Sequence, residues 1–167
     1  MDSVMERYCL DSNIYIEMKN GPYGFDIAPG FWMWVEHEAE AGVLYSPEAV
    51  HRELLSYKDE LSEWIRTRQA TSLFADPPNR EVQGLYRQVG DFVQTSYPSL
   101  QVADFLSGAD PWVIAQAWND RSIVVTHEAR VDASSRKPKI PNICEHFGIR
   151  YIKLYDLLRI RGARLGG

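Results

Sequence analysis

The sequence predicts an α/β protein built around a mainly parallel central sheet, and two observations support this prediction. Residues 122–126, Ser-Ile-Val-Val-Thr, form a mostly β-branched run that is typical of a central parallel strand. Short apolar runs also alternate with helical patterns, in the order strand, helix, strand, helices, strand, helix, strand. The 167 residues are 45% apolar and show no repeats or linkers, so we expect a single domain over residues 1–167.

The first predicted strand covers residues 8–10 and runs directly into Asp11. Ligands of open α/β sheets bind at the carboxyl ends of the strands, so Asp11 is expected to face a site rather than the core. The apolar pattern resumes at residues 14–16, which indicates a turn or the start of a helix. Cys9 and Cys144 lack the spacing of a metal or disulfide framework, and we interpret them as small buried apolar residues.

Residues 20–30 are rich in glycine and proline and form a predicted loop. A helix over residues 31–40 follows and ends at Gly42, and residues 43–45 form a short strand. The aromatic residues that open this helix, Phe31, Trp32 and Trp34, are expected in the core or at a dimer face, with base stacking as the alternative.

The next helix is predicted to begin with Ser46 as its N-cap and Pro47 as its first residue. It carries Glu53, which has no cation three or four residues away. Its neighbour Glu48, by contrast, has Arg52 at i+4 and is expected to form an ordinary surface pair. Glu53 is therefore a candidate for a role beyond its own helix, with a solvated glutamate as the alternative.

The remaining elements follow from local patterns. Ser107 and Asp110 have the spacing of a capping box, and Asp110 followed by Pro111 is typical of an N-cap and a first helical residue. An acid at a helix start also offers lone pairs to a metal, so both roles are open to Asp110. The other predicted elements are helices over 58–71, 80–97, 140–147 and 155–161, an extended piece at 73–74, loops over 76–79 and 130–139, and a strand at 150–154.

Four acids stand out by position: Asp11, Glu53, Asp110 and Glu128. Glu128 follows the predicted strand at residues 122–126, so it also lies at the carboxyl end of a strand. Clustered carboxylates repel one another, and a divalent cation relieves that repulsion. Mg²⁺ and Mn²⁺ prefer oxygen ligands, bind through few carboxylates plus substrate phosphate, and can activate a water for phosphodiester hydrolysis.

Four segments, taken in order, resemble the PIN domain nucleases. They are Leu10-Asp11-Ser12-Asn13, His51-Arg52-Glu53-Leu54, residues 108–115 around Asp110, and Val124-Val125-Thr126-His127-Glu128. More narrowly, three blocks resemble the PIN-like DUF4411 group: Pro-Gly-Phe-Trp at residues 29–32, Gly-Ala-Asp-Pro-Trp at 108–112 and Lys-Ile-Pro-Asn-Ile-Cys at 139–144. The resemblance covers nearly the whole chain, and all four segments in order are fairly specific.

The resemblance implies the PIN-like three-layer α/β/α sandwich and cleavage of single-stranded RNA with Mg²⁺ or Mn²⁺. It also implies frequent use as the toxin of a toxin–antitoxin pair, with a cognate antitoxin protein as partner; a homodimer is a further expectation. Asp11, Glu53 and Asp110 would be the principal metal ligands and, with Glu128, the catalytic acids.

The resemblance also assigns supporting residues and shows two departures. Ser12 or Asn13 would orient Asp11 or a bound water, and Thr126 would support the site through its hydroxyl. Glu128 stands where the family usually has aspartate, which leaves open whether it binds the metal directly. Ser12 replaces the commoner threonine and keeps the hydroxyl.

The charge of the chain is unevenly distributed. Residues 129–167 hold nine Lys and Arg against three Asp and Glu, a net +6, whereas residues 1–128 carry a net −11. An acidic body beside a basic segment suits a metal site next to a polyanion groove, with ordinary surface variation as the alternative. We assign four basic residues to RNA phosphates, with a solvated loop as the alternative: Arg130, Arg136, Lys137 and Lys139.

Two other functions are alternatives to a metal-dependent nuclease. A haloacid-type hydrolase would need a second aspartate two residues after Asp11, where Asn13 stands. A non-catalytic PIN-fold module that binds RNA or protein is the stronger alternative, although all four acid positions are filled. The acidic N-terminus and the lack of a long apolar run predict a cytoplasmic protein with no membrane partner.

Overall fold

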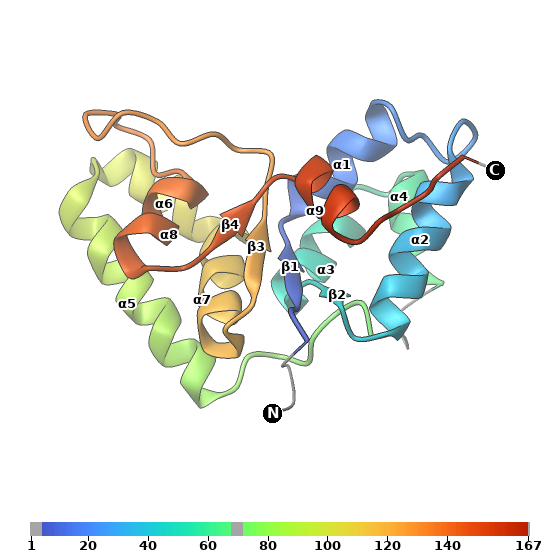
Figure 1. The fold of residues 1–167 in the computed structure, drawn as a ribbon. Helices are drawn as coiled ribbons and strands as arrows, with labels where there is room; N and C mark the ends of the chain where they lie inside the picture. The colour runs from blue at the N-terminus through green and yellow to red at the C-terminus, as the bar shows by residue number, and fades with distance from the viewer. Residues whose placement is uncertain (1–4, 68–71, 167) are drawn as a thin grey trace.

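Four short parallel strands form the centre of the structure, a computed structural model that describes residues 5–67 and 72–166. The strand order is β2-β1-β3-β4 (Figure 1). Their bounds are β1 (Tyr8–Leu10), β2 (Leu44–Tyr45), β3 (Ile123–Val125) and β4 (Tyr151–Ile152). All three strand pairings are parallel, so the predicted α/β class with a mainly parallel sheet is confirmed.

Helices lie on both sides of this sheet. Helix α7 packs against β1 and β3 and is itself covered by α5, while α2 packs against β2. In Figure 1, α5, α6 and α7 lie to the left of β1, and α2 and α4 lie to the right. The helices of the described residues are α1 (Ser12–Asn20), α2 (Pro29–Glu40), α3 (Glu48–Leu55), α4 (Glu60–Arg66), α5 (Arg80–Ser96), α6 (Ser99–Ser107), α7 (Asp110–Asp120), α8 (Ile140–Phe147) and α9 (Leu154–Ile160).

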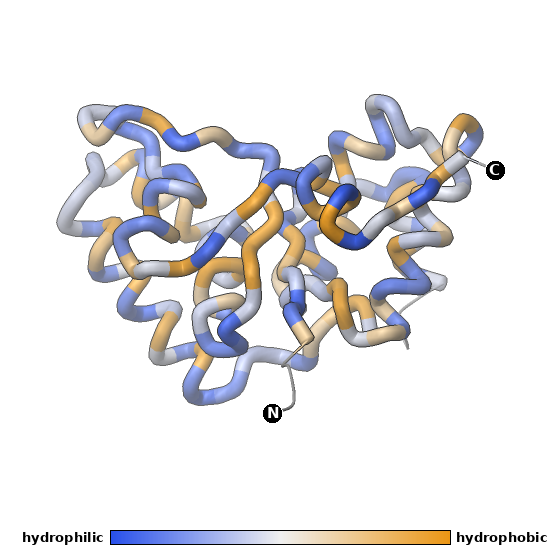
Figure 2. The backbone as a smooth tube through the Cα atoms, viewed as in Figure 1, coloured by the Kyte–Doolittle hydropathy of each residue, from blue (hydrophilic) through white to orange (hydrophobic). Residues whose placement is uncertain are grey.

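The central strands are buried on both faces, as parallel strands between helices must be. Leu10 and Val125 lie opposite each other on β1 and β3, and neither is exposed to solvent. Cys9 and Cys144 are free and buried, which confirms their interpretation as small apolar residues. In Figure 2, β3 at the centre is hydrophobic, whereas the loop between β3 and α8 is largely hydrophilic.

A polar network joins β2 to α7 and to the start of β3. The Tyr45 hydroxyl on β2 donates to Asp120 Oδ2 at 2.7 Å and lies 2.6 Å from the hydroxyl of Ser122. Gln116 on α7 donates to the same Asp120 oxygen at 2.9 Å. These bonds hold the last residue of β2 against the C-terminal end of α7 and against the residue that precedes β3.

Helix α6 is missing from the sequence predictions, which assigned no element to residues 98–106. It begins after Pro98 and ends at Ser107, whose hydroxyl donates to the carbonyl of Asp104 at 2.7 Å. The predicted capping box of Ser107 and Asp110 is therefore wrong. Ala109 is the N-cap of α7 and Asp110 is its first residue, without a side-chain capping bond.

Other boundaries shift by one or two residues. Pro47, predicted as the first residue of its helix, is instead the N-cap of α3. Phe74 forms an isolated parallel bridge with Ser46. The helix predicted over residues 58–71 is α4, and the last four of those residues lie outside the described part of the chain. Within the described residues, no helix is long and apolar enough to cross a membrane.

The C-terminal segment lies against the first turn of α2. A Cβ atom on Gly30 would lie 2.5 Å from the carbonyl oxygen of Leu165, so only glycine fits there. The segment is also held by Arg161, whose Nη2 lies 3.0 Å from Oε2 of the buried Glu38.

Gly30→Ala should therefore lower the free energy of unfolding by about 1–3 kcal/mol, because a backbone must move to admit the methyl group. Gly84→Ala in α5 is the matched control, since nothing lies within 4 Å of its Cβ position. This control should gain about 0.5–1 kcal/mol from better helix propensity. Thermal denaturation of both variants measures the difference, and a stabilised Gly30→Ala protein would contradict the close approach.

Candidate active site

Asp11 lies at the centre of the site, where β1 ends and α1 begins. Its Oδ1 accepts the backbone N–H of Asn13 at 2.7 Å, so the side chain caps α1. Its Oδ2 accepts the hydroxyl of Thr126 at 2.7 Å, from 115 residues further along the chain. The side chain is fully buried. Both carboxylate oxygens are thus held in place by donors from two different strand ends.

Glu53 is joined to this centre through Ser12. The Ser12 hydroxyl donates to Glu53 Oε2 at 2.8 Å and so links α3 to the start of α1. Glu53, which has no cation on its own helix, thus has a long-range partner instead. The structure thus shows Ser12 holding Glu53, while the backbone of Asn13 and the hydroxyl of Thr126 hold Asp11.

Glu128 connects the end of β3 to α8. Its backbone N–H donates to Thr126 Oγ1 at 3.1 Å, and its Oε2 accepts the N–H of Ile140 at 2.8 Å. Ile140 is the first residue of α8, so Glu128 satisfies a donor that has no partner within the helix. Two further bonds close the intervening loop, in which Asn142 accepts from the N–H of Val131 at 3.0 Å and donates to its carbonyl at 2.8 Å.

A cleft of about 780 Å³ opens above these residues. Asp11 and Thr126 are fully buried and do not line it. Lys137 and Lys139 line the cleft, whereas Arg130 and Arg136 do not. From the predicted set the cleft brings together Asn13, Glu53, Asp110, Glu128, Lys137 and Lys139.

The sequence predictions missed one wall of this cleft, which α6 provides through Gln101, Asp104 and Phe105. The available signal was Pro98, which can precede a helix, followed by Val102 and Phe105 at helical spacing. Both of those apolar residues are buried in the structure.

Mutual repulsion and burial perturb two of the acids. Burial raises the pKa of Asp11 to about 7, and Glu128 and Glu53 add to the rise, while its two hydrogen bonds oppose it. Burial also raises the pKa of Asp110 to about 8, with contributions from Asp11, Glu128 and Glu53, and Lys139 opposes it. Asp11 and Asp110 are therefore each close enough to Glu53 and Glu128 to be repelled by them.

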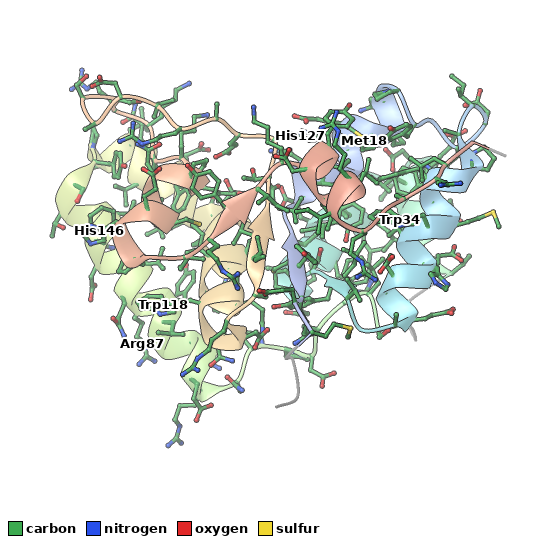
Figure 3. The ribbon with its side chains drawn as sticks, viewed as in Figure 1. Met18, Trp34, Arg87, Trp118, His127 and His146 are labelled. Carbon is green, nitrogen blue, oxygen red and sulfur yellow. The ribbon has the colours of Figure 1, made fainter. Side chains whose placement is uncertain are left out.

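These residues fit a hard divalent cation. In residues 5–67 and 72–166, no three His, Cys, Asp or Glu side chains are already arranged to hold one ion together. Mg²⁺ needs fewer, because it binds through one or two carboxylates and keeps several waters. His127 lies outside the cluster, next to α9 (Figure 3). Its Nε2 is 3.8 Å from Glu17 Oε2, and its ring lies near that of Tyr155, a residue of α9. The donors that remain are carboxylate oxygens, which suit Mg²⁺ or Mn²⁺.

Comparison with known proteins identifies the family. Residues 8–165 match a family described as a domain of unknown function, DUF4411. The chain belongs to the DUF4411 family. This DUF4411 protein is also similar in fold to VapBC-1 from nontypeable Haemophilus influenzae, solved at 2.2 Å. The TM-score is 0.51 at 15% identity, over 87% of this chain and 96% of that chain.

No protein of curated function matches the DUF4411 chain. The likeness to VapBC-1 shows the fold, and together with the family match it confirms the predicted PIN-like architecture.

Asp110→Asn should stabilise the metal-free protein at alkaline pH. The pKa of Asp110 is about 8 in the folded protein and about 3.9 in an unfolded chain, so the native state binds the proton more tightly. Wild-type stability from this group is therefore full below about pH 4 and is lost as the pH rises to about 8. At about pH 8 the variant should gain at least about 1 kcal/mol, which raises Tm by roughly 2–4 °C.

Thermal denaturation with chelator across this pH range measures the effect. Asp104→Asn is the matched control, because Asp104 is an exposed aspartate of the same cleft and its loss should leave Tm unchanged. Equal Tm values for wild type and Asp110→Asn at every pH would show that ionisation of Asp110 does not destabilise the folded protein.

Proposed function

We propose that this DUF4411 protein is an endoribonuclease that cleaves single-stranded RNA with Mg²⁺ or Mn²⁺. The observation that carries the proposal is a fully buried aspartate, Asp11, held by two hydrogen bonds next to three further carboxylates at one cleft. Burying acids beside one another costs stability, and such costs are typical of functional sites rather than of structural ones.

Asp11, Glu53 and Asp110 would hold the ion, with Glu128 as a further acid of the same cleft. When bound, a divalent ion supplies charge stabilisation for the phosphodiester and lowers the pKa of a coordinated water. The residues of the chain supply position: the Thr126 hydroxyl and the α1 N-terminus keep the lone pairs of Asp11 in one orientation. A fixed ligand carboxylate needs no reorganisation when substrate arrives.

The positions of Lys137 and Lys139 favour a polyanionic substrate, because both side chains line the cleft that contains the carboxylates. Arg130 is differently placed, since its Nε lies 2.6 Å from Glu145 Oε2 on the exposed surface of α8. We therefore assign the first phosphate contacts to the two lysines and give Arg130 and Arg136 at most an outer role.

We also propose that the protein is the toxin of a toxin–antitoxin pair. The fold similarity to VapBC-1 and the family resemblance support this role, and a cognate antitoxin protein would be the partner. A homodimer and a cytoplasmic location remain predictions from the sequence.

A non-catalytic RNA- or protein-binding module is the second candidate. A binding module gains nothing from buried acids whose pKa values are raised, and their loss would stabilise it. The retention of the whole acid set therefore favours the enzyme.

Cleavage of a mixed single-stranded RNA pool by purified protein tests the proposal directly. With Mg²⁺ or Mn²⁺ the wild type should cleave, and chelator should abolish cleavage. Asp11→Asn and Asp110→Asn should each lose at least about 100-fold in rate, because each removes a ligand charge and keeps the shape. Asp104→Asn should stay within about threefold of wild type, since Asp104 stands on the cleft wall. Wild-type rates in the Asp11 and Asp110 variants would refute the site.

Neutralising Lys137 and Lys139 together to glutamine should weaken RNA binding and flatten its salt dependence. Two lost phosphate contacts should make the slope of log Kd against log salt shallower by about 1–2. Arg130→Gln is the control, because its guanidinium is already paired with Glu145. Fluorescence anisotropy titrations at several salt concentrations measure the slopes, and an unchanged slope in the lysine variant would exclude these residues from the groove.

A further inference from the structure

The cleft continues past Glu53 as a groove between α3 and α7. A second hollow of about 360 Å³ shares Glu53, Ser107, Gly108 and Ala109 with the main cleft. Arg52 and Trp112 line this second hollow, and a third, smaller hollow is also lined by both of them. The surface therefore forms one path from the two lysines, over the acids, to a tryptophan.

Trp112 is a rigid, partly exposed aromatic plane in this path. Its ring stacks on Tyr86 with centroids 4.0 Å apart and planes 15° apart. Tyr86 lines neither hollow and is anchored by its hydroxyl, which donates to the carbonyl of Leu106 at 3.4 Å. The tyrosine therefore covers one face of the indole without lining either hollow itself. Pro111 and Val113, on either side in the sequence, are buried, whereas Trp112 remains partly exposed.

The charges along the path suit a single strand of nucleic acid. Lys137 and Lys139 stand at one end and Arg52 at the other, with the carboxylates between them. The Arg52 side chain is 66% exposed, and its pair with Glu48 at 3.1 Å is a surface pair of the weak kind. A backbone of phosphates can thus meet positive charge on both sides of the acidic centre.

We propose that Trp112 is a stacking platform for a base next to the scissile phosphate in single-stranded RNA. This inference rests on the proposed function and adds a base-binding position to it. The hollow that Trp112 lines adjoins the cleft that Asp110 lines, through the shared residues Glu53, Gly108 and Ala109, so one strand can reach both. Stacking on an indole tolerates every base, because each has a π-face, so the platform favours unpaired over paired RNA rather than one sequence.

The test measures binding of a short, fluorescein-labelled single-stranded RNA of mixed sequence to the Asp110→Asn protein with Mg²⁺, where cleavage does not interfere. Adding Trp112→Ala should raise Kd about 5- to 100-fold, the range found for loss of one stacked base. Trp112→Phe should restore most of the affinity. Binding of the same sequence as a duplex should be unchanged by Trp112→Ala, because its bases are not free to stack.

Trp118→Ala is the matched control on the same helix. Trp118 lines a different hollow with Phe147, their rings 4.7 Å apart, and in Figure 3 it lies well away from His127, which follows the carboxyl end of β3. Its loss disturbs packing without touching the groove, so Kd should stay within about twofold of the parent. Circular dichroism and Tm establish that each variant is folded.

The outcomes separate this inference from the proposed function. Equal Kd values for Trp112→Ala and Trp118→Ala would overturn the platform, as would a wild type with no affinity for single-stranded RNA. Asp110-dependent cleavage with normal binding by Trp112→Ala would overturn the platform alone. Trp112-dependent binding without cleavage by wild type would overturn the nuclease and keep the platform.

Discussion

Asp11 has no exposed surface, and a carboxylate in that position is stable only if donors reach both of its oxygens. One donor comes from the start of α1 and the other from Thr126 at the end of β3. The register that pairs Leu10 with Val125 puts Asp11 and Thr126 level at the edge of the sheet. A slip of β1 against β3 would break the ladder and leave a buried oxygen unpaired, so the sheet and the site select the same register.

Each of the other acids reaches this point from a different element: Glu53 from α3, Asp110 from the start of α7 and Glu128 from the end of β3. Ser12, next to Asp11, donates its hydroxyl to Glu53 of α3 and so holds that side chain. Glu128 extends β3 and is held by the first N–H of α8. Asp110 alone reaches the cleft from a helix start without capping it. The result is an acid-rich cleft in which, among the residues that the structure describes, the opposing charges on the lining come from Lys137 and Lys139 of the loop after Glu128.

Local signals explain how much of this was predictable. Short apolar runs predict the strands, so the acids that follow two of them, Asp11 and Glu128, could be identified from the sequence. Glu53 stood out for a different reason, because no cation lies three or four residues away on its helix. Helix α6 was missed although Pro98 and the helical spacing of Val102 and Phe105 indicate it, because only these two of its apolar residues are buried and the pattern is weak. The spacing of Ser107 and Asp110 was a local pattern that tertiary structure overrode. Which loop cations face the cleft depends on loop geometry, and the sequence carries no periodicity that would reveal it.

The contact between Glu128 and the N-terminus of α8 has a consequence for the loop between them. Together with the two bonds between Asn142 and Val131, it pins both ends of the segment that carries Lys137 and Lys139. A loop whose two ends are already fixed has lost much of its conformational entropy during folding. Its lysines then meet a polyanion without a large ordering cost at the moment of binding. Glu128, one of the four acids, thereby also pre-organises the two lysines that oppose them.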